Sequence, residues 1–237
     1  MNSAGARPPV VLICGQLCTE ALWRDQKPAL EKLTDVRVSV QRDHDNVGDM
    51  AAAVLAAMPQ RFSIVAHAMG GFIAFEILRR SPARVASVAL LSTLAPNDTP
   101  VQTARREGYL RLVEQGRFAE VVEERIPMLL HPAHRDDTAL VSVVRKMAAD
   151  TGEAAFLNQQ RAIMSRPDSR PGLAAISCPA LILFARQDGI VTPAHQDEMH
   201  RGIRGSQLEI IEDCGHLMTL EKPEAVNQLL VDWIAAT

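Results

Sequence analysis

The chain has 237 residues, 47% of them hydrophobic, with a formal net charge of −3. This size suits one globular domain, or one domain with a sizeable insertion, and the slightly acidic balance without a basic stripe argues against nucleic acid as a partner. The longest mainly apolar, uncharged run, residues 62–75, is shorter than the roughly 20 residues that cross a bilayer, so we expect no membrane partner.

Short apolar runs rich in β-branched residues alternate with helical patterns along the chain. Nearly continuous apolar runs are typical of parallel strands that helices cover on both faces. Such runs occupy residues 9–13, 36–40, 62–66, 85–91, 180–184 and 207–211. Residues 46–58, 69–80 and 223–234 have helical spacing. The pattern predicts an α/β fold with a doubly wound, mostly parallel sheet and right-handed crossovers.

The alternation stops between about residues 97 and 172. Four amphipathic helices are predicted there, at residues 105–114, 118–130, 138–149 and 153–164. We therefore divide the chain into a core, residues 1–96 and 173–237, and a helical insertion, residues 97–172. The insertion is either an ordinary helical subdomain or a lid over an active site.

The most informative segment runs from Phe62 to Glu76, where a strand passes directly into a helix through Ala66, His67, Ala68, Met69 and Gly70. Small residues stand two places before and two places after residue 68. Taken alone, this could be an ordinary tight strand-to-helix turn. It also resembles the V-G-H-S-M-G-G turn of the α/β-hydrolase family, in which the central serine is the nucleophile. In this chain alanine replaces that serine.

Two later segments resemble the family's remaining catalytic motifs, in the family's chain order of nucleophile, acid and base. Asp188 follows the strand at 180–184, with a proline close behind, and His216 lies in a Gly-His loop after the strand at 207–211. In such a triad the histidine takes the serine proton and the acid orients the histidine. In isolation, Asp188 could be a turn residue and His216 a solvated loop residue. Asp213 is a competing acid that we expect to shape the turn instead.

The segment from Val10 to Trp23 resembles the family's first strand, H-G-x turn and following tryptophan, with Cys14 in place of the histidine. The resemblance implies that the backbone N–H groups of Gln16 and Met69 form an oxyanion hole. It also implies that three neighbouring side chains contact the substrate, namely Leu17, His67 and Leu217.

The cysteines and the remaining histidines suggest no further chemistry. Cys14, Cys18, Cys178 and Cys214 form no C-x-x-C pair, so a reduced setting is the simplest interpretation. We expect Cys14 and Cys18 to be buried and inert rather than replacement nucleophiles. His44, His131 and His134 have no supporting carboxylate pattern, so we predict surface loop residues and neither metal nor cofactor. Residues 1–7 have no export signal, which predicts a cytoplasmic protein.

Alanine at position 68 has two explanations. It is either an engineered Ser→Ala change in an ester hydrolase, which we favour because the other motifs are intact, or a natural feature of a non-hydrolase. The resemblance implies a serine hydrolase of small or medium carboxylic esters or lactones that works through an acyl-enzyme. Two alternatives stay open: a lyase or oxygenase that uses His216 and Asp188 without a cofactor, and a non-catalytic receptor for a small ligand.

Overall fold

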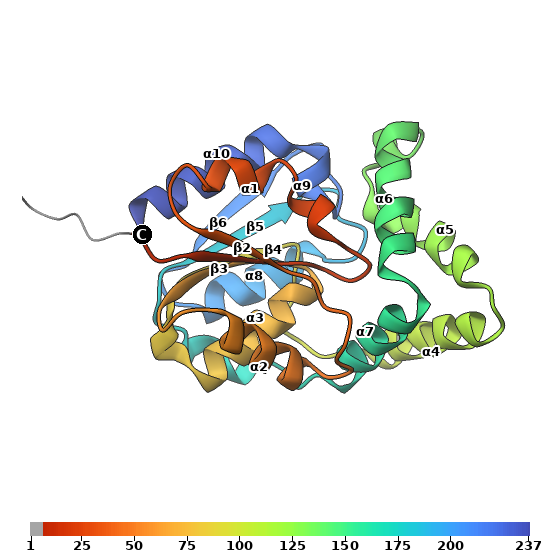
Figure 1. The fold of residues 1–237 in the computed structure, drawn as a ribbon, viewed down its shortest axis with the longest axis horizontal. Coiled ribbons are helices and arrows are strands. Elements are labelled where there is room, and N and C mark those ends of the chain that lie inside the picture. Colours follow the sequence, from red (N-terminus) through yellow and green to blue (C-terminus); the bar gives the residue numbers. More distant parts are fainter. Residues whose placement is uncertain (1–6) are drawn as a thin grey trace, which may run out of the picture.

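Six strands form one parallel sheet in the computed structural model, which describes residues 7–237 (Figure 1). Their order across the sheet is β2-β1-β3-β4-β5-β6, and every neighbouring pair is parallel. The strands are β1 (Val10–Ile13), β2 (Val36–Ser39), β3 (Phe62–His67), β4 (Val85–Leu91), β5 (Ala180–Ala185) and β6 (Gln207–Ile211). The predicted doubly wound parallel sheet is confirmed, because all six predicted apolar runs are strands.

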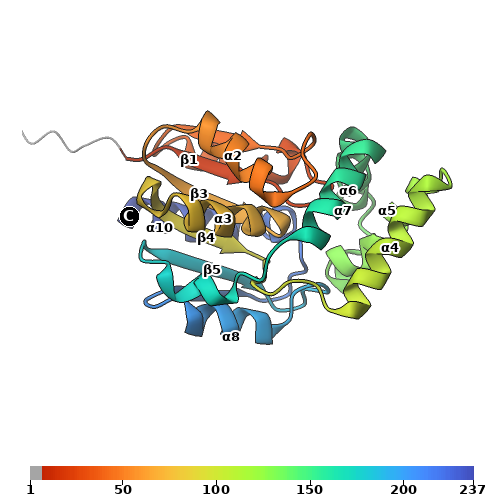
Figure 2. The same ribbon diagram turned by 90° about the horizontal axis from the view of Figure 1, so that it is seen from below.

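Helices cover both faces of the sheet (Figures 1 and 2). One face carries α1 (Gln26–Leu30) and α10 (Pro223–Ala236), with the short α9 (Met218–Glu221) beside them; the other carries α2 (Val47–Ala57), α3 (Met69–Arg80) and α8 (Pro193–Gly202). A separate hydrophobic core fills each space between sheet and helices. All six residues of β3 are buried, which explains why this strand appears in the sequence as an unbroken apolar run.

The helical insertion between β4 and β5 consists of α4 (Pro100–Glu114), α5 (Phe118–Leu129), α6 (Thr138–Thr151) and α7 (Glu153–Ser165). These helices lie together beyond one end of the sheet (Figure 1). Helix α4 begins at Pro100 rather than at residue 105, because Thr99 and Gln102 form a capping box around its first turn. None of the helices within residues 7–237 combines the length and apolarity needed to cross a bilayer.

The helical insertion has a small hydrophobic core of its own, and Leu17 from the loop after β1 belongs to it. Leu17 packs with six buried side chains of the insertion: Tyr109, Val113, Val121, Val122, Ala148 and Phe156. The insertion is therefore anchored directly on the loop that carries Gln16 and Leu17.

Candidate active site

The turn between β3 and α3 holds Ala68 in a backbone conformation that alanine rarely adopts, with φ 50° and ψ −113°. Two contacts from β4 and the residues after it fix this turn. The Ala68 N–H donates to the Leu91 carbonyl at 2.9 Å, and the Thr93 hydroxyl donates to the Ala68 carbonyl at 2.7 Å. A Cβ at Gly70 would lie 2.6 Å from the Ile13 carbonyl oxygen, which explains the glycine two places after residue 68.

Asp188 and His216 come from the loops after β5 and β6 and form a direct pair. The Asp188 carboxylate oxygens lie 2.8 and 3.0 Å from His216 Nδ1, and both side chains are almost completely buried. Asp188 also accepts hydrogen bonds from the N–H groups of Ile190 and Val191. Burial acts to raise the pKa of Asp188, but the nearby imidazole and these hydrogen bonds outweigh it and lower the pKa. The ionised carboxylate fixes the proton on His216 Nδ1, which leaves Nε2 as the basic nitrogen.

His67 lies next to this pair and contacts its backbone. The imidazole Nε2 is 2.9 Å from the His216 carbonyl oxygen, and the two ring centroids are 5.0 Å apart. Burial, followed by the proximity of His216, lowers the pKa of His67 to about 3. His67 is therefore neutral and donates from Nε2, because a carbonyl oxygen can only accept.

Glu221 supports the loop of His216, a contact that the sequence analysis missed. Its buried carboxylate accepts hydrogen bonds from the N–H groups of Gly215 and His131 at 3.1 and 2.8 Å, and lies 2.8 Å from His134 Nδ1. It therefore ties the loop of His216 to the chain after α5. The sequence analysis did not pair His134 with a carboxylate, because Glu221 is remote in the sequence. Asp213 forms a turn at φ 50°, and Asp188 is the acid that contacts His216.

The two predicted oxyanion donors lie beside Ala68. Met69 is the first residue of α3, and Gln16 lies in the loop after β1, where a Cβ on Gly15 would be 3.3 Å from the Ala68 methyl. Within residues 7–237, neither the Gln16 nor the Met69 backbone N–H donates a hydrogen bond to the protein. The next N–H, of Leu17, donates instead to the buried side chain of Gln159 in α7 at 3.0 Å.

A cavity of about 80 Å³ lies between the carboxyl ends of the strands and the helical insertion. Seven of the eight predicted site residues line it, and they are Gln16, Leu17, His67, Ala68, Met69, His216 and Leu217. The eighth, Asp188, contacts the far nitrogen of His216. His216, Gln16, Met69 and the strained residue 68 thus line one small cavity.

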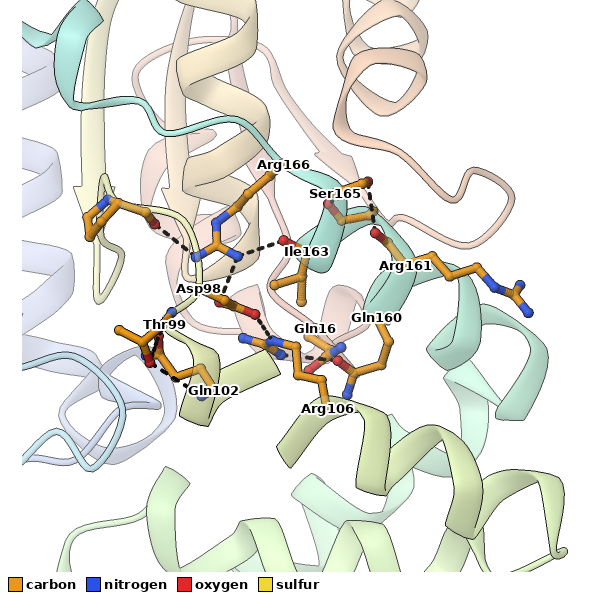
Figure 3. Close-up of polar contacts among 12 residues, drawn as sticks. Gln16, Asp98, Thr99, Gln102, Arg106, Gln160, Arg161, Ile163, Ser165 and Arg166 are labelled. Carbon is orange, nitrogen blue, oxygen red and sulfur yellow. Dashed lines mark hydrogen bonds and ion pairs between the residues drawn. The ribbon is translucent and has the colours of Figure 1, made fainter. Parts of the chain in front are cut away.

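The wall that the helical insertion contributes is rich in arginine, a feature that the sequence analysis did not predict. Asp98 lies between Arg166 and Arg106 and contacts both guanidinium groups (Figure 3). Burial acts to raise the pKa of Asp98, but the two arginines outweigh it and lower the pKa. A third arginine, Arg125 of α5, donates to the Gln16 side-chain oxygen at 2.6 Å. All three arginines line the cavity.

The cysteines near the site are buried, as predicted. Burial, followed by the proximity of Cys18, raises the pKa of Cys14 well above its ordinary value, and burial raises the pKa of Cys18 to about 12. Neither sulfur is a thiolate near neutral pH, so neither is a suitable replacement nucleophile.

Comparison with known proteins gives consistent matches over nearly the whole chain. "Putative carbamate hydrolase RutD" of Klebsiella pneumoniae is 27% identical, over 97% of this chain and 92% of that protein. A solved thermophilic esterase from Thermogutta terrifontis, described as malate-bound, is 26% identical with a TM-score of 0.88, covering 98% of this chain and 91% of that one. The enol-lactonase of Burkholderia xenovorans LB400 has the same fold, with a TM-score of 0.88 at 21% identity, covering 99% and 94%. The sequence model of the "Alpha/beta hydrolase family" matches residues 23–229. The chain therefore belongs to the alpha/beta hydrolase family.

Proposed function

We propose that this chain is the inactive alanine form of a serine hydrolase that cleaves small carboxylic esters or lactones. One observation carries the proposal: Ala68 keeps a strained conformation, with φ 50°, over a cavity that it shares with His216, while Asp188 holds His216 by Nδ1. Strain of this kind costs on the order of 1–3 kcal/mol and persists where the surrounding structure imposes it, commonly at active sites. An ordinary strand-to-helix turn does not require a non-glycine residue with φ 50° and ψ −113°.

In the proposed mechanism a serine at position 68 attacks the ester carbonyl while His216 Nε2 removes the hydroxyl proton. The carbonyl oxygen becomes an oxyanion that the N–H groups of Gln16 and Met69 stabilise, each by about 3 kcal/mol. His216 then gives the proton to the departing alcohol. A water molecule, activated by the same imidazole, hydrolyses the acyl-enzyme and releases the acid.

We also propose that the helical insertion serves as the lid of this site. Its residues Tyr109, Val122, Met128 and Ile163 line the cavity together with Ala68. A wall from the insertion excludes water, which strengthens the electrostatic interactions inside the cavity. The putative carbamate hydrolase RutD and the Thermogutta terrifontis esterase are named as a hydrolase and an esterase, which supports a hydrolytic function here.

The decisive experiment compares the chain as it stands with its Ala68→Ser variant on short-chain aliphatic and aromatic esters. We expect the serine variant to raise kcat/KM by at least about a thousandfold, because the nucleophile, base and acid act as one unit. Adding His216→Ala to that variant should return the rate to the alanine level. A serine variant no faster than the alanine chain would contradict the proposal.

Ser92 provides an internal control, because it is buried in the same cavity and its hydroxyl has no hydrogen-bond partner within the described residues. Changing Ser92→Ala in the Ala68→Ser variant should leave most of the activity, since the Ser92 hydroxyl forms no hydrogen bond to His216 or to any other described residue. If instead the alanine chain is active and loses activity on His216→Ala, serine-free chemistry by His216 and Asp188 is the correct function. Ligand binding without turnover in both forms would indicate a receptor.

A further inference from the structure

The cavity contains a buried cation that no carboxylate of the described residues neutralises. Arg125 lies on α5 and is only 7% exposed. The one hydrogen bond of its side chain within residues 7–237 is the 2.6 Å contact from Nη1 to Gln16 Oε1, and its Nε has no partner there. Two further arginines of the cavity wall have a counter-charge. Arg106, which is half-buried, and Arg166, which is buried, both pair with the carboxylate of Asp98.

The Gln16 side chain adds a second unused donor. An arginine has only donors, so the atom of Gln16 that faces Arg125 must be the amide oxygen. The amide nitrogen, Nε2, therefore points elsewhere, and it is buried without a hydrogen-bond partner among the described residues. Arg125 and Gln16 together present buried N–H groups that need an acceptor, and both residues line the cavity.

The charges of the cavity wall have the sign that suits an anion. Four arginines, at positions 105, 106, 125 and 166, and one aspartate, Asp98, line the cavity, whereas the whole chain has a net charge of −3. Burial of Arg125, with Arg106 nearby, lowers its pKa to about 10. The folded chain thus holds this cation at a cost in stability, and a buried polar group left without a partner is destabilising unless a ligand satisfies it.

We propose that Arg125 and Gln16 form a carboxylate subsite, so that the ester or lactone that this site takes carries a second, ionised carboxyl group. A guanidinium fork suits the two oxygens of a carboxylate, and the Gln16 amide N–H adds a further donor. The backbone N–H of Gln16 is also a proposed oxyanion donor. The carboxylate therefore binds only a few bonds away from the scissile carbonyl, and the substrate is a short half-ester of a dicarboxylic acid or a lactone with a short acidic arm.

This inference extends the proposed hydrolase function, but a binding measurement can test it without catalysis. The alanine chain should bind monoethyl succinate at least about tenfold more tightly than diethyl succinate, as a charge-assisted contact in a buried site predicts. Calorimetric titration of both compounds measures this preference. Equal affinity for the two compounds would overturn the subsite.

Variants assign the preference to individual residues. Arg125→Gln should abolish the preference for the half-ester and leave the affinity for the diester within about twofold, whereas Arg125→Lys should retain part of it because the charge remains. Arg145→Gln is the matched control, because it removes one arginine from an exposed pair with Glu123 on the outer side of the insertion. If Arg125→Gln weakens both compounds equally, the arginine only supports the Gln16 loop and the subsite does not exist.

A second variant guards against misfolding. Gln16→Glu supplies Arg125 with a carboxylate from the protein itself, so it should raise Tm and eliminate the preference for the half-ester. Unchanged half-ester binding in this variant would overturn the proposal.

Assays of the Ala68→Ser form then separate the two inferences. Hydrolysis of both succinate esters at equal kcat/KM rejects the subsite and keeps the hydrolase. Half-ester binding that depends on Arg125 without any hydrolysis keeps the subsite and rejects the hydrolase.

Discussion

His67 is a buried histidine that the fold keeps neutral, and this has a consequence for stability. Its folded pKa is about 3, against an ordinary value of 6.5. Between these two values the unfolded chain binds a proton that the folded chain does not bind. The free energy of unfolding therefore decreases as the pH falls through this range. At pH 5 the loss from this one residue is about 2 kcal/mol relative to neutral pH.

The first prediction removes that titration. In a His67→Asn variant the free energy of unfolding should be lower at neutral pH, because a buried ring and its contact with the His216 carbonyl are lost. Its decline between pH 6.5 and pH 5 should be smaller by about 2 kcal/mol. Urea titrations at several pH values measure this. Asp188, whose pKa is also lowered, affects stability only below its ordinary pKa near 4, outside this window. A decline as steep as that of the parent chain would show that folding does not lower the pKa of His67.

The sequence analysis identified the residues whose type and position are determined by short-range motifs along the chain. The small residues around Ala68 and the position of Met69 follow from a turn whose geometry permits few side chains. Arg125, Glu221 and Gln159 were missed, because their partners lie on elements remote in sequence. One signal for Arg125 existed: it follows Val121 by four residues and therefore falls on the buried stripe of α5. A charged residue on such a stripe indicates a partner or a ligand inside.

At the scale of elements, the close packing of α3 on β1 sets the geometry of the site. Gly70 lies in the first turn of α3, and any side chain there meets the backbone of Ile13. This approach brings the start of α3, with the Met69 N–H, next to the loop after β1, which carries the Gln16 N–H. The distance between the two proposed oxyanion donors thus depends on the absence of a single methyl group.

The second prediction is that Gly70→Ala destabilises the chain by about 1–3 kcal/mol through overpacking, although alanine favours helix by nearly 1 kcal/mol over glycine. Chemical denaturation measures the change. Gly108→Ala on α4 is the control, because there a Cβ would meet only the end of the Arg111 side chain at 3.9 Å. That change should stabilise the chain by up to about 1 kcal/mol. Equal effects at the two glycines would contradict the packing argument.

The elements that the sequence analysis missed are short or begin with a local cap. Helices α1 and α9 have five and four residues, too few for a periodic pattern to develop. Helix α8 consists mostly of polar residues, so its sequence has no clear apolar stripe. Its start can nevertheless be recognised, because Thr192 is the N-cap and Pro193 is the first helical residue. Strands β1, β3, β4 and β5 were predictable because nearly all of their residues are buried, which leaves few residue types available. The edge strands β2 and β6 have one buried residue each.

At the scale of the whole molecule, a buried ion cluster closes the base of the helical insertion. Asp98 stands where the chain enters the insertion, and Arg166 stands where it leaves. Arg166 also donates to the Pro96 carbonyl at 2.9 Å and lies over the Phe72 ring of α3 at 4.2 Å. The two ends of the insertion are thus joined to each other and to the helix that begins at the proposed nucleophile position.

The third prediction is that Asp98→Ala destabilises the chain by about 3–5 kcal/mol, because it leaves Arg166 buried without a counter-charge. Thermal and urea unfolding report this loss. Asp150→Ala removes the same charge from an exposed pair with Lys146 and should change stability by less than about 1 kcal/mol. Losses of similar size in the two variants would show that the cluster at the base of the insertion is no stronger than a surface pair.

The strand order has a further consequence for how the molecule assembles during synthesis. Strands β1 to β4 are adjacent in the sheet and complete by Leu91, whereas the partner of β4 on its other side, β5, begins only at Ala180. A growing chain can therefore align four strands before the ribosome has made the four-helix segment, whereas the long-range β4–β5 pairing and the β5–β6 pairing come afterwards. His216 and Asp188 belong to the portion translated after that segment, so the proposed catalytic base reaches the turn at Ala68 only in the final stage of folding.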